Sequence, residues 1–128
     1  MNILPVYFRA EEFRCRCGCG ESAVSAALVL RLDALRGLCG PLRITSGRRC
    51  AAHNAAVGGA EFSRHMAGLA ADVVPLSCSM EDFFLLASLF FFPKRDGGPD
   101  ELIKYRGYCH LAVGRDRGNF WTGGQIKI

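Results

Sequence analysis

The feature that most restricts the possible folds of this chain is the segment from Ile44 to Val73, where polar groups stand among small residues. The segment holds His53 and His65, two of the three histidines, together with Asp72. Burying such groups without partners is unfavourable by roughly 2–7 kcal/mol each, so a plain hydrophobic core is a poor interpretation. We therefore interpret the segment as a site that the rest of the chain supports.

His65 and Asp72 stand seven residues apart in SRHMAGLAAD. Gly68 and the following AADVVP favour a looped or helical start that runs into a short strand. A catalytic zinc ion takes three protein ligands and leaves one position for water, so His53 or His110 would complete the set. The structural alternative is that His65 caps or packs a helix and Asp72 closes a turn.

The order of residues in SGRRCAAHNAAVGGAEFSRHMAGLAADV resembles the core signature of the zinc D-alanyl-D-alanine carboxypeptidase family, a structural cousin of the hedgehog signalling domain. The matching positions are Ser46, Gly47, Arg49, His53-Asn54, Val57-Gly58-Gly59, Ser63, His65, Gly68, Ala70 or Ala71, and Asp72. His110 corresponds to the final histidine of the family, and FRAEEFRCRCGCG resembles the opening of its single-domain branch. The resemblance runs from about Phe8 to Val113.

The resemblance implies a zinc peptidase that hydrolyses D-amino-acid bonds of peptidoglycan stem peptides, as a D,D-carboxypeptidase or an endopeptidase of the endolysin type. His65, Asp72 and His110 would bind Zn²⁺. Arg49 would hold the terminal carboxylate of the substrate, and Ser63 would help to orient it. A guanidinium suits that task because its planar fork of donors matches a carboxylate.

The catalytic base is unknown. Relatives carry an acidic residue or a histidine a few residues before the last ligand or two after it, where this chain has Tyr105, Gly107 and Ala112. The remaining candidates are Asp100, Glu101, Asp116 and Glu61. Two alternative functions follow, a zinc-binding module of the cell wall without catalysis, and a structural Cys-rich domain whose histidines and aspartate are incidental.

The expected fold is a single α+β domain over residues 1–128, with a small antiparallel sheet and helices packed on one side. Apolar residues at helical spacing predict a helix over 21–38, and Ser79 with Asp82 predicts the start of a second helix over 79–92. A strand is expected over 42–45, and two strands over 101–113 around Arg106-Gly107. In the tail from Arg115 to Ile128, Trp121 is expected to cover the edge of the core.

Charge and hydropathy exclude two classes of function. The net charge is +4 and the arginines are scattered, which does not suit a nucleic-acid-binding protein. The apolar run from Phe83 to Phe92 is too short to span a bilayer. We see no signal peptide and expect a soluble monomer, cytoplasmic as synthesised, that reaches the cell wall by phage-type release or as part of a larger export route.

The seven cysteines cannot all pair within one chain. The cluster CRCGC is either a metal clip or a set of free or partly paired thiols in a reducing compartment, and its alternate spacing favours the thiols. The resemblance places Cys50 near an N-terminal cysteine. Cys109 is expected to face away from His110, because neighbours on a strand point to opposite sides.

Overall fold

The computed structural model describes residues 2–114 and 119–127. Its elements in chain order are β1 (Asn2–Ile3), η1 (Ala10–Phe13), β2 (Val24–Ser25), α1 (Ala26–Cys39), β3 (Leu42–Ser46), α2 (Ala51–Ala56), β4 (Ala70–Pro75), α3 (Met80–Ala87), η2 (Lys94–Asp96), β5 (Glu101–Lys104), β6 (Cys109–Ala112), β7 (Phe120–Trp121) and β8 (Ile126–Lys127). This mixture of helices and a small antiparallel sheet confirms the predicted α+β class.

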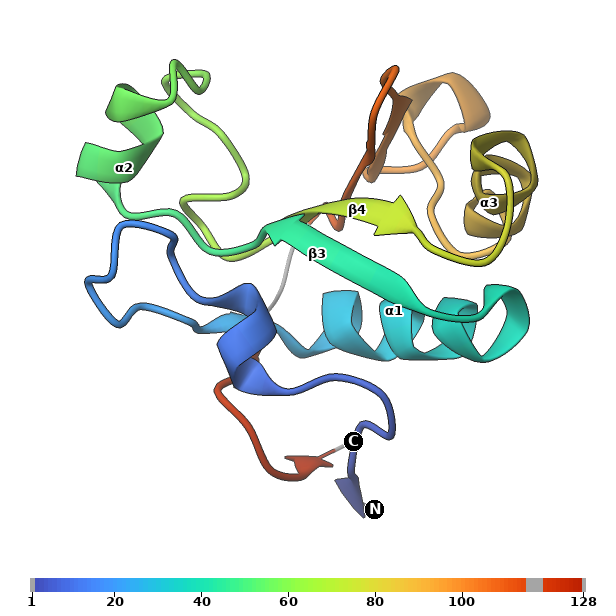
Figure 1. Ribbon diagram of the computed structural model, residues 1–128, viewed down its shortest axis with the longest axis horizontal. Coiled ribbons are helices and arrows are strands. Elements are labelled where there is room, and N and C mark those ends of the chain that lie inside the picture. Colours follow the sequence, from blue (N-terminus) through green and yellow to red (C-terminus); the bar gives the residue numbers. More distant parts are fainter. Residues whose placement is uncertain (1, 115–118, 128) are drawn as a thin grey trace.

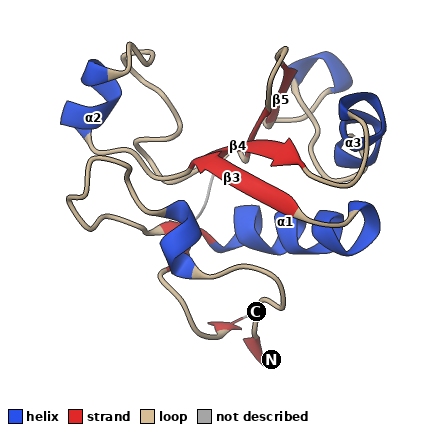
Figure 2. Ribbon diagram, in the orientation of Figure 1, coloured by secondary structure: helices blue, strands red, loops and turns tan. Residues whose placement is uncertain are grey.

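The central sheet has the strand order β3-β4-β6-β5, and every neighbouring pair is antiparallel. Figures 1 and 2 show β3 and β4 crossing the middle of the molecule, with α1 beneath them and α3 at one end. Helix α2 lies apart from α1 and α3, above the opposite end of β3 (Figure 1). The sheet therefore has one end beside the helical core and another beside the segment that contains the predicted site.

The core forms where α1 and α3 pack against the sheet. Its fully buried side chains include Leu28, Leu32, Leu35, Val73, Phe83, Phe91 and Leu111. Cys109 is buried in this core, as expected from strand alternation, while its neighbour His110 lines a cleft on the other side. Burial of apolar surface is the main stabilising contribution to such a core.

The first helix begins later than the spacing predicted. Residues 21–25 are not helical, because Val24 and Ser25 pair with Trp121 and Phe120 in a short antiparallel ladder. The Ser25 hydroxyl then accepts a hydrogen bond from the Leu28 amide and caps α1, which is a common role of serine at this position. The extended backbone of β2 thus displaces the helix start to Ala26.

The second helix is shorter than predicted, although its start is confirmed. The Ser79 hydroxyl accepts from the Asp82 amide at the N-terminus of α3. The helix ends at Ala87. Tighter turns follow, in which an amide bonds to the carbonyl three residues earlier, as the Leu89 amide does to the Leu86 carbonyl. Asp100 accepts from the Phe92 amide, and Phe91 and Phe92 are no longer helical before Pro93.

The chain ends meet at one edge of the molecule. β1 pairs with β8, and both termini lie close together there (Figure 1). Trp121 is buried and meets the Phe13 ring edge-on at 6.1 Å, so it contributes to the core as expected. Among the helices in the described residues, none combines the length and the apolar character that crossing a membrane requires.

Candidate metal centre and cleft

Two of the predicted ligands stand opposite each other on neighbouring strands. Asp72 on β4 pairs directly with His110 on β6, so their side chains project from the same face of the sheet. The distance from Asp72 Oδ1 to His110 Nδ1 is 2.9 Å. Sheet register alone therefore brings a carboxylate and an imidazole together from positions far apart in the sequence.

The third predicted ligand comes from the turns that precede β4. His65 is buried, and its Nδ1 lies 2.8 Å from the Gly47 carbonyl oxygen. A carbonyl only accepts, so Nδ1 carries the proton and, in the neutral ring, Nε2 presents a lone pair. That Nε2 lies 3.2 Å from Asp72 Oδ1, which is also an acceptor. Two acceptors that face each other favour a cation or a proton between them.

The donor set fits a catalytic type of zinc site. One ligand atom from each of His65, Asp72 and His110 can be chosen so that all three lie within 4.8 Å of one another. Two imidazole nitrogens and one carboxylate oxygen match the ligands that zinc uses in hydrolytic enzymes, and three ligands leave one position open. His53 lies on α2 and does not belong to this group.

Electrostatics keep Asp72 ionised. Burial by itself raises the pKa of this carboxyl, but when the two imidazoles are protonated, hydrogen bonds from His110 and His65 and their positive charge outweigh burial and lower the pKa to about 2. For His110, burial lowers the pKa, while hydrogen bonds to Asp72 and Glu101 raise it more strongly, so the net pKa is raised. The centre is therefore a strong attractor of positive charge.

Arg49 is fixed beside this carboxylate. Its Nε donates to Ser46 Oγ at 3.0 Å, its Nη1 to Asn54 Oδ1 at 3.2 Å, and its Nη2 to Asp72 Oδ2 at 3.4 Å. Asn54 is buried and donates in turn to the Ala60 carbonyl. Three of the five donors of the guanidinium are engaged in this way, which holds the fork in one orientation.

Ser63 has a structural contact in the same region. Its hydroxyl accepts from the His65 amide at 3.2 Å, so it stabilises the turn that carries His65. A hydroxyl can accept from one group and donate to another, so this bond leaves the proton of Ser63 available to the cleft.

These side chains line a cleft of about 300 Å³. Its lining residues are Arg49, Val57, Gly58, Gly59, Ser63, His65, Asp72, Tyr105, Tyr108 and His110. The rings of Tyr105 and Tyr108 stack with centroids 4.8 Å apart and form one wall. A second hollow of about 220 Å³ adjoins it and shares Ser63, Tyr105 and His110. Together they make an open groove across the candidate metal centre.

Sequence reasoning missed the role of Glu101. Its Oε1 lies 2.8 Å from His110 Nε2, on the side of the ring away from Asp72. This is the position of the carboxylate that commonly orients a metal-binding histidine. The β-hairpin centred on Arg106-Gly107 could have indicated this contact. Its register pairs Ile103 with His110 and Glu101 with Ala112, which places Glu101 and His110 on one face of the sheet.

The other candidates for a base have different positions. Asp100 is buried in a salt bridge with Arg31 at 2.8 Å and also accepts from the Phe92 and Gly114 amides, so its function is structural. Glu61 is exposed in the turn before Ser63. Asp116 lies outside the described residues.

The chain was compared with protein-family models and with curated proteins. A family model described as Peptidase M15 matches residues 6–110, a stretch that includes His65 and Asp72 and ends at His110. A search of curated proteins gives no match.

Proposed function

Because the chain belongs to the peptidase M15 family, we propose that it is a zinc-dependent peptidase that hydrolyses D-amino-acid bonds of peptidoglycan stem peptides. His65, Asp72 and His110 would hold the metal. The observation that carries the proposal is the convergence of these three side chains within a cleft that also contains a fixed guanidinium. Zn²⁺ bound there would supply Lewis-acid activation of the scissile carbonyl and of a water molecule.

Arg49 and Ser63 support the substrate class. Three of the five donors of the Arg49 guanidinium contact protein groups, and Arg49 lines a cleft that a peptide carboxylate could enter. The proton of Ser63 would be donated to a substrate oxygen. A D,D-carboxypeptidase places the C-terminal carboxylate of its substrate at such a cation, because charge-assisted hydrogen bonds are about twice as strong as neutral ones.

The adjoining hollow supports a substrate that continues beyond the scissile bond. Phe62 and Ile103 are exposed along it, while Arg64 and Glu101 supply polar contacts. The stem peptide would extend over this surface with its terminal residue toward Arg49. Since peptidoglycan lies outside the cytoplasm, the function also requires release or export of the protein.

One observation favours a second function, a zinc-binding module of the cell wall without turnover. Among the described residues that line the cleft, Asp72 is the one carboxylate, and it is already committed to the histidines. A general base typically contributes about 10²–10⁴-fold to the rate. A peptidase that lacks this group would retain binding and hydrolyse slowly.

The test is to measure zinc content and peptidoglycan cleavage together for the native chain, His110→Ala and His53→Ala. We expect His110→Ala to lose one zinc per chain and the release of D-alanine or muropeptides. His53→Ala, which alters a histidine outside the ligand group, should retain both. Zinc bound at this centre without cleavage would support the binding module instead, and an unchanged zinc content in His110→Ala would refute the metal centre.

A further inference from the structure

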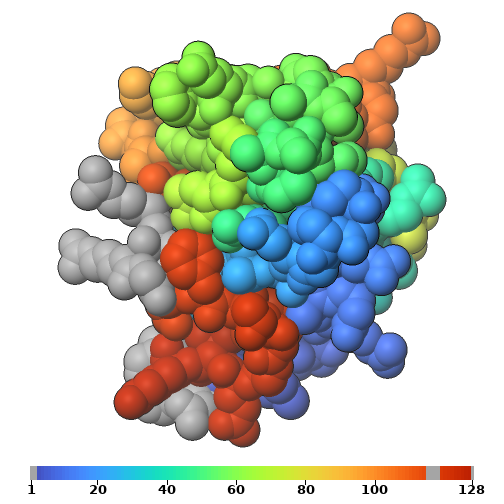
Figure 3. All heavy atoms as spheres, turned by 90° about the vertical axis from the view of Figure 1, so that its left-hand side faces the viewer, coloured from blue at the N-terminus to red at the C-terminus, as the bar shows by residue number. Residues whose placement is uncertain are grey.

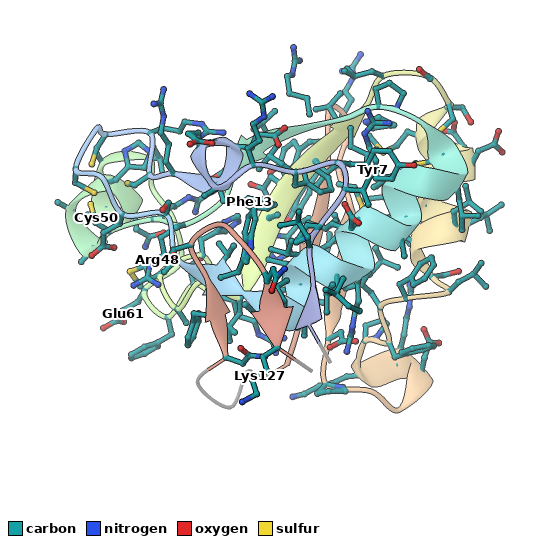
Figure 4. The ribbon with its side chains drawn as sticks, turned by 90° about the horizontal axis from the view of Figure 1, so that it is seen from below. Tyr7, Phe13, Arg48, Cys50, Glu61 and Lys127 are labelled. Atoms are coloured by element: carbon teal, nitrogen blue, oxygen red, sulfur yellow. The ribbon has the colours of Figure 1, made fainter. Side chains whose placement is uncertain are left out.

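We propose that Cys15, Cys17, Cys19 and Cys50 form a second metal site, a closed tetrathiolate site for Zn²⁺ that braces the wall of the cleft. All seven cysteines lie in the described residues, and none forms a disulfide. One sulfur from each of these four lies within 4.8 Å of the other three. In Figure 4, sulfur atoms gather beside Cys50, where the N-terminal loop meets the start of α2.

The sulfur separations match a metal site. The Sγ atoms of Cys15 and Cys17 are 3.4 Å apart, those of Cys17 and Cys50 are 3.6 Å apart, and those of Cys15 and Cys50 are 3.8 Å apart. Zinc–sulfur bonds of about 2.3 Å in a tetrahedron place the sulfurs about 3.8 Å apart. A disulfide needs about 2.05 Å, and no pair among these three stands out as bonded. Three nearly equal separations are compatible with one shared ion between the sulfurs.

The fold brings the four residues together from two segments. Cys15 is buried just after η1, and the loop that carries Cys17 and Cys19 turns back through Gly18 and Gly20, whose φ angles are +86° and +90°. Cys50 stands at the start of α2. Figure 3 shows the α2 segment (green) directly above this N-terminal loop (blue).

Backbone amides already point at the sulfurs. The Cys50 amide lies 3.4 Å from Cys15 Sγ, and the His53 amide lies 3.4 Å from Cys50 Sγ. Such donors stabilise negative charge on sulfur and orient it, as the groups behind metal ligands commonly do.

The charge of the surroundings also suits a metal thiolate. Four thiolates with one divalent cation have a net charge of −2. Arg14 and Arg16 flank Cys15 in the sequence, and Arg48 and Arg49 immediately precede Cys50, so this part of the chain is rich in positive charge, although the guanidinium groups of Arg16, Arg48 and Arg49 bond to oxygen atoms elsewhere. Because four protein ligands leave no open position, the ion would stabilise structure and would not activate water.

The site would connect two segments that shape the cleft. The end of η1, which leads into the N-terminal loop, is already joined to the segment after β3 by a hydrogen bond from the Arg48 amide to the Phe13 carbonyl at 2.9 Å. That segment supplies the Gly47 carbonyl, which orients His65, and the guanidinium of Arg49. A zinc ion bridging Cys15 and Cys50 would therefore fix the wall on which these two groups depend.

The test compares metal content in the native chain, the double variant Cys17→Ser/Cys19→Ser, His110→Ala and the control Cys78→Ser, all purified with a reducing agent. Cys17 and Cys19 are exposed, so their substitution spares the core. We expect two zinc ions in the native chain and in Cys78→Ser, and one in each of the other two. Zinc retained by His110→Ala then belongs to the thiolates, whether or not the native chain cleaves peptidoglycan.

Cobalt substitution of the native chain provides a readout that does not depend on the folding of any variant. Cobalt bound by thiolates absorbs intensely in the near ultraviolet, whereas cobalt bound by imidazole and carboxylate does not. The native chain and His110→Ala should both show this band, and Cys17→Ser/Cys19→Ser should lack it. Absence of the band from the native chain, or a mass that reveals disulfides among these cysteines after native purification, would overturn the proposal.

Discussion

His110 and Glu101 are joined by a 2.8 Å contact between Nε2 and Oε1, while the other ring nitrogen of His110 faces Asp72 at 2.9 Å. The imidazole therefore stands between two carboxylates that come from different strands. With Nε2 protonated toward Glu101, Nδ1 has its lone pair directed to the point where the predicted ligands converge. Glu101 thus sets both the tautomer and the orientation of the His110 ring.

We expect Glu101→Gln to weaken zinc binding at the cleft by about 10–100-fold, because an amide orients the imidazole less strongly and does not increase its basicity. Competition with a chelator measures the affinity directly. The matched control is Glu81→Gln, which alters an exposed glutamate on α3. Equal zinc affinities for the two variants would show that Glu101 does not support the metal centre.

We expect Arg49→Lys to reduce kcat/KM about 10–100-fold on peptides with a free C-terminal carboxylate. A single ammonium replaces a planar fork of donors that also contacts Ser46 and Asn54. Peptides amidated at the C-terminus should lose much less. Arg43→Lys, an exposed position on β3, is the control. A similar loss on both kinds of peptide would indicate that Arg49 acts on the structure of the cleft and not on the carboxylate.

Gly59 lies against the Asn54 side chain, and a Cβ at this position would overlap Asn54 Oδ1 and approach Arg49 Nη1. We expect Gly59→Ala to displace the guanidinium and to lower kcat/KM by about 10–100-fold, since small misplacements at an active site have effects of this size. Far-ultraviolet circular dichroism should remain native. Gly107→Ala, where a Cβ meets open space, should leave activity unchanged. Equal activity of the two variants would contradict the positioning of Arg49 through Asn54.

Asp100 accepts from the Phe92 and Gly114 amides as well as from Arg31. We expect Asp100→Ala to lower the free energy of unfolding by about 3 kcal/mol, because two backbone amides and the Arg31 guanidinium lose their buried partner. Urea denaturation measures the change. The exposed control Asp96→Ala should stay within about 0.5 kcal/mol of the native chain. A variant of native stability with greatly reduced turnover would instead make Asp100 part of the catalytic machinery.

The helices show where sequence patterns were sufficient and where they failed. The capping serine of α3 and the apolar stripe of α1 could be predicted from the sequence, because both depend on residues that are close in sequence. The start of α1 was predicted wrongly, because Val24 is held in an extended conformation by pairing with Trp121, on a strand nearly a hundred residues later. Local spacing contains no information on such a partner.

The cleft shows a similar division. Strand alternation correctly placed Tyr108 and His110 on one face and Cys109 on the other, where the structure buries it in the core. Glu101 was included only as one of several candidates for a base, although the predicted hairpin implied its register with His110. Its hydrogen bond depends on side-chain rotamers and on the twist of the sheet, which the sequence does not specify.

By itself, the sequence determined the α+β class, the order of the motif residues and the residue types able to bind a metal. These properties follow from short-range periodicity and from the chemistry of individual side chains. The tertiary structure decided that His65, Asp72 and His110 converge, that Glu101 lies behind His110, and that Cys50 meets the N-terminal cysteines. Each of these relations joins segments that are remote in sequence, and only the packing of the sheet, with the turns at its end, sets the distances between them.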